Sequence, residues 1–305
     1  MKILHVISYP RSGSTILGLA LGQYEETAFL GEVSAILTGD WNKPCGCGDH
    51  ETIMVRECPL WGPILNKVQA VLERHELWDV KRDDGLKKDL RKDFLKEVLK
   101  QQKKDCIHRE LEATEEILRI IYEDASDNLK VPVIVDSSKD PIYFQILINY
   151  FGENHLPVHL FRDPRAVVYS ARRRPVVTRK GIPLSIWRSS RIALGWGAKN
   201  FLFETYIQKS KGASYSIRYE DWCKNPKKIT DGIMENLFSS FIKTPFIDQS
   251  SFEVTTSHSF HGNRSRKSSG TIKIKSDQSW KKGLKRKFKL ASTIPSLLFM
   301  RRYGY

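Results

Sequence analysis

The sequence lacks any apolar run approaching the 18 residues that suggest a membrane-spanning helix. Its first apolar stretch begins at residue 3, which leaves no room for the charged and long apolar regions of a secretion signal. Cysteine is scarce, and five in 305 residues is an odd number that argues against a disulfide framework. Internal repeats and low-complexity linkers are also absent. We therefore expect a folded, cytoplasmic protein.

Acidic residues are few relative to basic ones, 35 Asp and Glu against 50 Lys and Arg, which gives a formal charge of +15. Residues 264–305 alone contain thirteen basic residues and one acid, Asp277, and so carry +12 of this excess. Such a balance favours anionic partners such as nucleotide phosphates, nucleic acid, acidic glycans or a membrane surface. A solvated basic tail is the alternative interpretation of residues 264–289.

Short apolar stretches that end in polar turns alternate with helical spacing along the chain. The stretches expected to be strands are 2–8, 131–136, 156–161 and 214–218. Helices are expected at 14–22, from Pro164, over about 183–207 and after Asn225-Pro226. This alternation predicts an α/β fold with a central parallel sheet flanked by helices, similar to P-loop NTPases.

Residues 63–128 have helical spacing and dense mixed charge, and are predicted to form a helical insertion within a single domain spanning 1–305. The charged positions of these helices are expected to face solvent. In a parallel sheet, ligands bind at the carboxyl ends of the strands. The turns 9–15, 136–140 and 162–165 are therefore expected on one rim.

The first turn has the sequence YPRSGST, residues 9–15, and leads directly into a helix. A helix N-terminus offers unpaired backbone N–H groups, and small residues allow a phosphate to approach them. Against the pattern G-x-x-x-x-G-K-[ST], Gly13 and Thr15 fit, but Ser8 replaces the first glycine and Ser14 replaces the lysine. The turn therefore predicts a phosphate site that is not a Walker A loop, with a serine-rich helix cap as the alternative.

A second charged turn occurs in FRDPRAVVYSARRR, residues 161–174. Arg162 ends a predicted strand, and Ser170 lies two helical turns after Pro164. Both side chains can reach one anion only if the chain folds back. The alternative is an ion pair between Arg162 and Asp163 or another acid.

Taken together, these two segments resemble the sulfotransferases that use 3′-phosphoadenosine 5′-phosphosulfate (PAPS). YPRSGST is similar to the 5′-phosphosulfate loop of that family, and RDPRAVVYS to its 3′-phosphate signature. The resemblance extends to VIVDSSK, to RYEDW followed by NP, and to HGNRSRKSSG, and covers most of the chain outside the helical insertion.

The resemblance implies roles for individual residues of this sequence. The 5′-phosphosulfate would lie against Arg11, Ser12, Gly13, Ser14 and Thr15, and the 3′-phosphate against Arg162 and Ser170. A closing loop would add Arg266, Lys267 and Gly270, although Ser268 stands where the family has a glycine.

Transfer of a sulfuryl group depends on positioning and charge stabilisation, and the acceptor hydroxyl needs a base. The resemblance places Lys139 where the cytosolic enzymes have a catalytic histidine, and Glu32 where some bacterial enzymes have a glutamate base. We expect Glu32 to be the base, Lys139 to stabilise charge, and Arg11 to steady the leaving phosphate. A capping ion pair for Glu32 and a surface turn position for Lys139 are the alternatives.

Three cysteines, Cys45, Cys47 and Cys58, and His50 fall within fourteen residues. They are sufficient for a Cys₃His zinc site, but C-x-C is tighter than the usual C-x₂₋₄-C spacing. A zinc site, a local disulfide and free thiols all remain open.

The sequence as a whole predicts a PAPS-dependent sulfotransferase that acts on a hydroxyl of a carbohydrate, lipid or small molecule, with no metal needed for the chemistry. An ATP-dependent P-loop kinase, with Asp136 as its best Walker B residue, and a basic nucleic-acid-binding protein are the alternatives. We expect no nucleic-acid partner. The mixed apolar and basic C-terminus indicates contact with a membrane surface.

Overall fold

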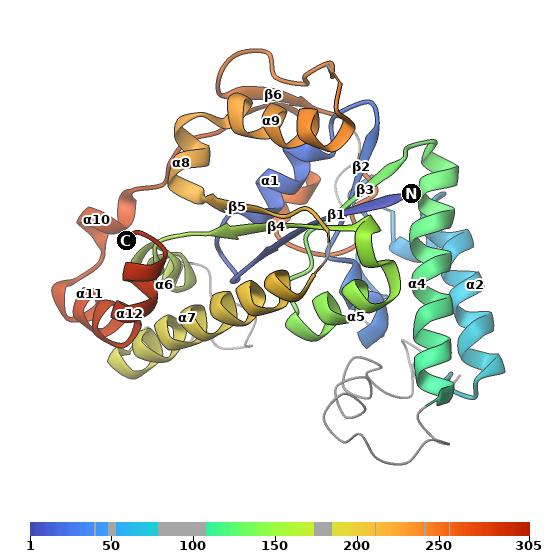
Figure 1. Ribbon diagram of the computed structural model, residues 1–305, viewed down its shortest axis with the longest axis horizontal. Helices are drawn as coiled ribbons and strands as arrows, with labels where there is room; N and C mark the ends of the chain where they lie inside the picture. Colours follow the sequence, from blue (N-terminus) through green and yellow to red (C-terminus); the bar gives the residue numbers. More distant parts are fainter. Residues whose placement is uncertain are drawn as a thin grey trace.

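A parallel sheet forms the centre of the molecule (Figure 1). The computed structural model describes residues 1–39, 41–47, 53–78, 108–173, 185–210, 212–240, 242–255 and 257–305. Within these ranges the strand order is β2-β3-β1-β4-β5, with β1 at Lys2–Ser8, β2 at Thr27–Gly31, β3 at Val133–Asp136, β4 at His155–Phe161 and β5 at Tyr215–Arg218. All the pairings are parallel. The predicted α/β architecture is therefore confirmed.

Helices cover both faces of the sheet, because successive side chains of a strand point to opposite faces. On β1, Ile3 and Ile7 pack on one face and Leu4 and Val6 on the other. Figure 1 shows α1 and α9 on one side and α5 and α7 on the other. The larger helices are α1 (Ser14–Leu21), α2 (Trp61–Arg74), α4 (His108–Leu129), α5 (Pro141–Phe151), α6 (Pro164–Arg173), α7 (Ile186–Lys209) and α9 (Pro226–Phe238).

The strand β2 was not predicted from the sequence, since its five residues contain only a short apolar run. It ends at Gly31, where φ is +83° and an added Cβ would lie 2.7 Å from the carbonyl oxygen of His261. Because only glycine adopts this conformation without strain, the chain can turn here while touching the 257–261 segment. The turn places Glu32 at the carboxyl end of the sheet.

The helices α2 and α4 lie side by side (Figure 1) and bury their apolar faces. Ile64 of α2 and Ile117 of α4 belong to the same buried cluster as Ile3 of β1. Charged residues of these helices pair at the exposed surface, as Arg119 does with Glu115. Of the predicted insertion, residues 79–107 lie outside the described ranges.

The basic C-terminal segment is folded rather than a solvated tail. It contributes β7 (Gly270–Lys273), antiparallel to β6 (Ser251–Val254), and three helices, α10 (Ser279–Gly283), α11 (Arg286–Thr293) and α12 (Leu297–Arg302). Phe288 packs on Val168 of α6, and Met300 on Trp196 of α7. None of the helices within the described residues has the length and apolarity needed to cross a bilayer.

Candidate active site

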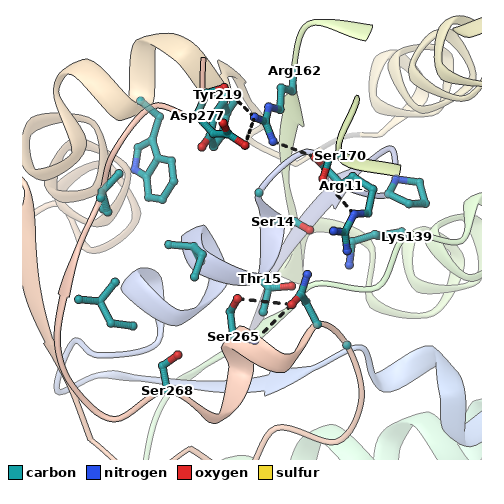
Figure 2. Close-up of a pocket in the computed structure, with 18 of the residues that line it drawn as sticks. Arg11, Ser14, Thr15, Lys139, Arg162, Ser170, Tyr219, Ser265, Ser268 and Asp277 are labelled. Atoms are coloured by element: carbon teal, nitrogen blue, oxygen red, sulfur yellow. Dashed lines mark hydrogen bonds and ion pairs between the residues drawn. The ribbon is translucent and has the colours of Figure 1, made fainter. Parts of the chain in front are cut away.

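A cavity of about 1270 Å³ opens at the carboxyl ends of the strands. Because β1 lies between β3 and β4, the turns after these strands meet at this rim, as expected for the switch point of an open sheet. Figure 2 shows side chains from all three turns facing the cavity, among them Ser14, Lys139 and Arg162.

The turn between β1 and α1 is shaped for an anion. Both Arg11 and Gly13 have positive φ, 74° and 99°, and an added Cβ at Gly13 would lie 2.8 Å from the ring of Tyr219. Gly13 is the N-cap of α1 and no side chain caps this helix end, so the serine-rich cap is not formed. The buried hydroxyls of Ser12 and Ser14 have no hydrogen-bond partner within the described residues. Buried hydroxyls normally find partners, so the hydroxyl of Ser14, which lines the cavity, fits a bound anion.

The chain folds back so that Arg162 and Ser170 both reach the turn between β1 and α1. Arg11 Nε donates to Ser170 Oγ at 3.2 Å, and Arg162 Nη1 donates to the carbonyl oxygen of Arg11 at 3.3 Å (Figure 2). The guanidinium of Arg162 also stacks over Tyr219, with 4.3 Å to the ring centroid. The structure therefore brings Arg11, Arg162 and Ser170 together at one wall of the cavity.

The alternative role of Arg162, an ion pair with Asp163 or another acid, is met by another acid, Asp277. Asp163 instead binds Arg165, with 2.6 Å between Oδ2 and Nη2, and accepts from the Arg165 backbone N–H at the start of α6. Arg162 lies 3.6 Å from Asp277 Oδ2 and donates to its carbonyl oxygen at 3.1 Å. Asp277 is partly exposed and sits on the segment that closes the cavity, so an incoming anion would compete with it for Arg162.

The two candidate catalytic residues lie in direct contact. Lys139 Nζ is 2.5 Å from Glu32 Oε1 and also donates to the carbonyl oxygen of Ser137 at 3.0 Å. Burial alone would raise the pKa of Glu32, but Lys139, together with His261, outweighs burial and lowers this pKa to about 2. Glu32 is therefore a carboxylate at neutral pH. Its side chain makes no capping hydrogen bond, but Glu32 is the N-cap residue of the short helix Val33–Thr38 and is ion-paired with Lys139, so the ion-pair alternative for Glu32 agrees with the structure. The Lys139 side chain is only 13% exposed, so a surface turn position does not fit.

His261 is a site residue whose position the sequence did not establish. Its Nδ1 lies 3.9 Å from Glu32 Oε2, and its carbonyl oxygen accepts from the Glu32 backbone N–H at 2.9 Å. The contact joins residues more than two hundred positions apart. No local pattern could have paired them.

The cavity has an excess of positive charge. Among the described residues that line it, Arg11, Lys139, Arg162, Lys273 and Lys275 are basic and Glu32 and Asp277 are acidic, five against two. Lys273 and Lys275 come from the basic C-terminal segment and were not singled out from the sequence. Part of the charge excess of this segment therefore faces the cavity, as an anionic ligand requires.

Four predicted cofactor residues lie elsewhere. Ser12 is buried in the turn, and neither it nor Arg266, Lys267 or Gly270 is among the described residues that line the cavity. Arg266 is buried and donates to the carbonyl oxygens of Pro44 at 2.7 Å and Ser259 at 3.0 Å. The cavity lining contributed by the segment 263–268 consists instead of Asn263, Ser265 and Ser268.

A second, apolar cavity of about 920 Å³ adjoins the first and shares Pro10 and Arg11 with it. Its apolar lining comes from α6, α7 and α12, and includes Val167, Ile192 and Phe299. Arg11 therefore stands between a cationic cavity and an apolar one.

The structure resembles known sulfotransferase structures. The sulfotransferase domain from the curacin biosynthetic pathway aligns over 100% of this chain and 97% of its own length, with a TM-score of 0.53 and 16% identity. The chain shares the fold of this domain. The sulfotransferase STF9 from Mycobacterium avium aligns over 77% of this chain and 63% of its own, with a TM-score of 0.43 and 13% identity. No protein-family model matches the chain, and no curated protein gives a match.

Proposed function

We propose that the protein is a PAPS-dependent sulfotransferase that acts on a hydroxyl acceptor. The observation that carries this proposal is the junction of the two phosphate motifs, in which Arg11 of the first turn donates to Ser170 and Arg162 lies beside them. PAPS has a phosphosulfate at one end and a 3′-phosphate on the ribose, so it needs two anion sites at a fixed separation. The fold shared with the sulfotransferase domain from the curacin biosynthetic pathway supports the same function.

The residues present fit such a donor. The unpartnered hydroxyl of Ser14, which lines the cavity, and the positive end of α1 suit the 5′-phosphosulfate. Arg162 and Ser170 suit the 3′-phosphate, because a guanidinium binds phosphate through paired hydrogen bonds. The carboxylate of Asp277 pairs with Arg162 and would be displaced by the 3′-phosphate.

When bound, PAPS would supply the sulfuryl group. The acceptor oxygen would form the new bond to sulfur while the bond from sulfur to the bridging phosphate oxygen breaks, leaving adenosine 3′,5′-bisphosphate. Glu32 would take the acceptor proton. Lys139 holds this carboxylate ionised through their ion pair. Negative charge on the transferring group would attract the Lys139 ammonium. Movement of Lys139 away from Glu32 would leave Glu32 more basic.

The second cavity favours an acceptor with an apolar part, a lipid or an apolar small molecule rather than a carbohydrate. Most of its lining is apolar and comes from three helices, with Arg188 and Arg191 of α7 beside it, and Arg11 connects it to the anion site. Comparing turnover of a long-chain alcohol with that of a simple sugar tests this preference, and faster transfer to the sugar would contradict it.

The sulfotransferase proposal is tested by calorimetry with adenosine 3′,5′-bisphosphate and then with ATP and Mg²⁺. We expect the bisphosphate to bind more tightly, and Arg162→Ala to weaken it by roughly 10-fold to 100-fold, the range for losing charge-assisted hydrogen bonds. Arg119→Ala is the matched control, because Arg119 is half-exposed on α4 and pairs with Glu115. Stronger binding of ATP with Mg²⁺ would overturn the proposal.

The kinase alternative has less support from the site. Asp136, its best Walker B residue, accepts from Tyr122 Oη at 2.6 Å and from the Ser138 backbone N–H at 2.7 Å. It is fully buried and is not among the described residues lining the cavity. The nucleic-acid alternative is tested by RNA binding: salt-dependent binding without any sulfuryl transfer would favour it.

A further inference from the structure

Three cysteines and one histidine meet behind the wall of the candidate active site. Cys45 and Cys58 are buried, while Cys47 and His258 are partly buried. The Sγ atom of Cys58 lies 3.5 Å from that of Cys45, 3.6 Å from that of Cys47 and 3.2 Å from Nδ1 of His258. All four ligand atoms lie within 4.8 Å of one another.

These separations match a metal site rather than a disulfide. A disulfide joins its sulfurs at about 2.05 Å. Two thiolates of a tetrahedral zinc site, each at about 2.3 Å from the metal, are roughly 3.8 Å apart. We infer that Cys45, Cys47, Cys58 and His258 bind a structural zinc ion. A site of three sulfurs and one imidazole nitrogen is closed to substrate, so its role is structural.

The backbone around the cluster is fixed by the fold. The Cys45 N–H donates to the carbonyl oxygen of Ile53 at 2.9 Å, and the Gly46 N–H donates to that of Ser259 at 3.1 Å. An added Cβ at Gly46 would lie 2.1 Å from Ser259 Oγ, so only glycine allows this approach. The loop with the tight C-x-C spacing therefore passes directly over the segment that carries His258.

Hydrogen-bond donors and a positive charge lie around the cluster. The Trp61 backbone N–H points to Cys58 Sγ at 3.5 Å. The guanidinium of Arg266 binds the carbonyl oxygens of Pro44 and Ser259, the neighbours of Cys45 and His258. Its positive charge offsets the net negative charge of zinc with three thiolates. This gives Arg266 a role outside the anion cavity.

The fourth ligand comes from a distant part of the chain. His50, the histidine that the sequence offered, lies outside the described residues. His258 is held in place instead, because Trp61 Nε1 donates to its carbonyl oxygen at 2.6 Å. The ion would therefore join the loop that carries Cys45 and Cys58 to the segment that carries His258, two hundred residues further on.

The same segment continues into the cavity wall. The Phe260 N–H donates to the carbonyl oxygen of Leu30 at 2.7 Å, and the His261 carbonyl oxygen accepts from the Glu32 N–H. Zinc bound at His258 would thus position His261 beside Glu32 without touching the substrate.

The test is metal analysis of the full-length protein purified without chelators under reducing conditions. We expect about one zinc per chain, and a lower melting temperature when a strong chelator removes it. Cobalt in place of zinc should give the visible bands of tetrahedral thiolate coordination. Cys58→Ser should lose the metal, whereas Cys223→Ser should keep it, because Cys223 lies outside the cluster.

His258→Gln is compared with His50→Gln to identify the fourth ligand. We expect zinc affinity to fall at least tenfold only in His258→Gln. A loss of zinc affinity in His50→Gln alone would overturn the assignment of His258 as the fourth ligand. Protein without zinc that also fails to bind added zinc when reduced would overturn the site itself, as would bound iron.

Thiol titration tests for a disulfide. A separate sample, purified without reductant and unfolded in chelator, should have all five cysteines as free thiols. A Cys45–Cys58 disulfide would remove two and contradict the inference.

Discussion

At the scale of single residues, the contact between Glu32 and Lys139 determines what chemistry the site can perform. A carboxylate 2.5 Å from an ammonium is held ionised, but it is a weak base while that contact lasts. The two residues were assigned separate roles from the sequence, and the structure shows that neither acts independently. Any ligand that attracts Lys139 therefore also changes the basicity of Glu32.

We predict that Glu32→Gln lowers kcat by roughly 10²-fold to 10⁴-fold, the range for losing a general base, and leaves binding of adenosine 3′,5′-bisphosphate nearly unchanged. Steady-state kinetics and calorimetry on the same variant measure the two quantities. A rate equal to that of the natural protein would remove Glu32 from the mechanism.

His261 lies beside Glu32, so a proton acceptor at this histidine is the competing hypothesis to Glu32, and His261→Asn tests it. A reaction that depends on a neutral imidazole loses rate below about pH 6.5, whereas one that depends on a carboxylate does not. With Glu32 as base, the natural protein should show no loss of kcat/KM near this pH, since the pKa of Glu32 in the free protein is lowered to about 2. A loss of kcat/KM near pH 6.5 that disappears in His261→Asn would transfer the role to His261.

At the scale of secondary-structure elements, the C-terminal helices present an unusual surface. Ile294 and Leu298 are 69% and 78% exposed, and Trp187 of α7 is 75% exposed. Exposed basic residues accompany them on α10, α11 and α12, namely Lys281, Lys282, Arg286, Lys287, Arg301 and Arg302. Apolar side chains with basic residues suit the surface of an anionic membrane. Phe299 of α12 also lines the apolar cavity, which would bring a membrane-borne acceptor close to Arg11.

We predict that the protein sediments with vesicles containing phosphatidylserine, and that Leu298→Asp reduces this binding by roughly tenfold or more, because an inserted leucine contributes about 1.5–3 kcal/mol. Ile247→Asp is the control, since Ile247 is also well exposed, at 63%, and directly precedes the β6 hairpin. Equal binding of the two variants, or no binding to anionic vesicles, would contradict membrane contact.

At the scale of the whole molecule, buried histidines make stability depend on pH. His5 and His155 lie side by side on neighbouring strands, with 3.0 Å between ring nitrogens, and His159 contacts Asn200 Oδ1 at 3.0 Å. Burial lowers the pKa of all three, and that of His159 to about 4. Each is neutral in the fold, whereas in the unfolded chain it binds a proton below about pH 6.5.

The unfolded chain therefore binds more protons than the folded protein between about pH 6.5 and pH 4, so stability falls as the pH is lowered through this window. For His159 alone we expect a loss of roughly 2 kcal/mol at about pH 5, measured as the free energy of unfolding in urea. His159→Gln should make the dependence shallower. The lowered pKa values of Glu32 and Asp248 also make stability fall with pH, but mainly below about pH 4.5, so the change between pH 7 and pH 5 reports the histidines. Unchanged stability from pH 7 to pH 5 would refute the prediction.

The sequence by itself determined the features that depend on neighbouring residues. Apolar runs ending in polar turns predicted β1, β3, β4 and β5, because buried parallel strands need continuous apolar residues. The spacing of Arg11, Ser12, Gly13 and Ser14 predicted a turn into a helix suited to phosphate, because the backbone geometry of such a turn is local. The short β2 was missed, since its pairing with β3 rather than its composition makes it a strand.

Only the tertiary structure decided the contacts between distant segments. Arg162 pairs with Asp277 rather than Asp163, His261 lies beside Glu32, and Arg266 is turned away from the anion cavity toward the cysteine cluster. His258 joins Cys58 across two hundred residues. Charge and hydrogen-bonding capacity are properties of each residue, but partners are set by which loops the sheet brings to one rim. The shared rim of the turns 9–15, 136–140 and 162–165 was expected from the predicted parallel sheet, but the individual side-chain pairs that form there cannot be inferred from spacing along the chain.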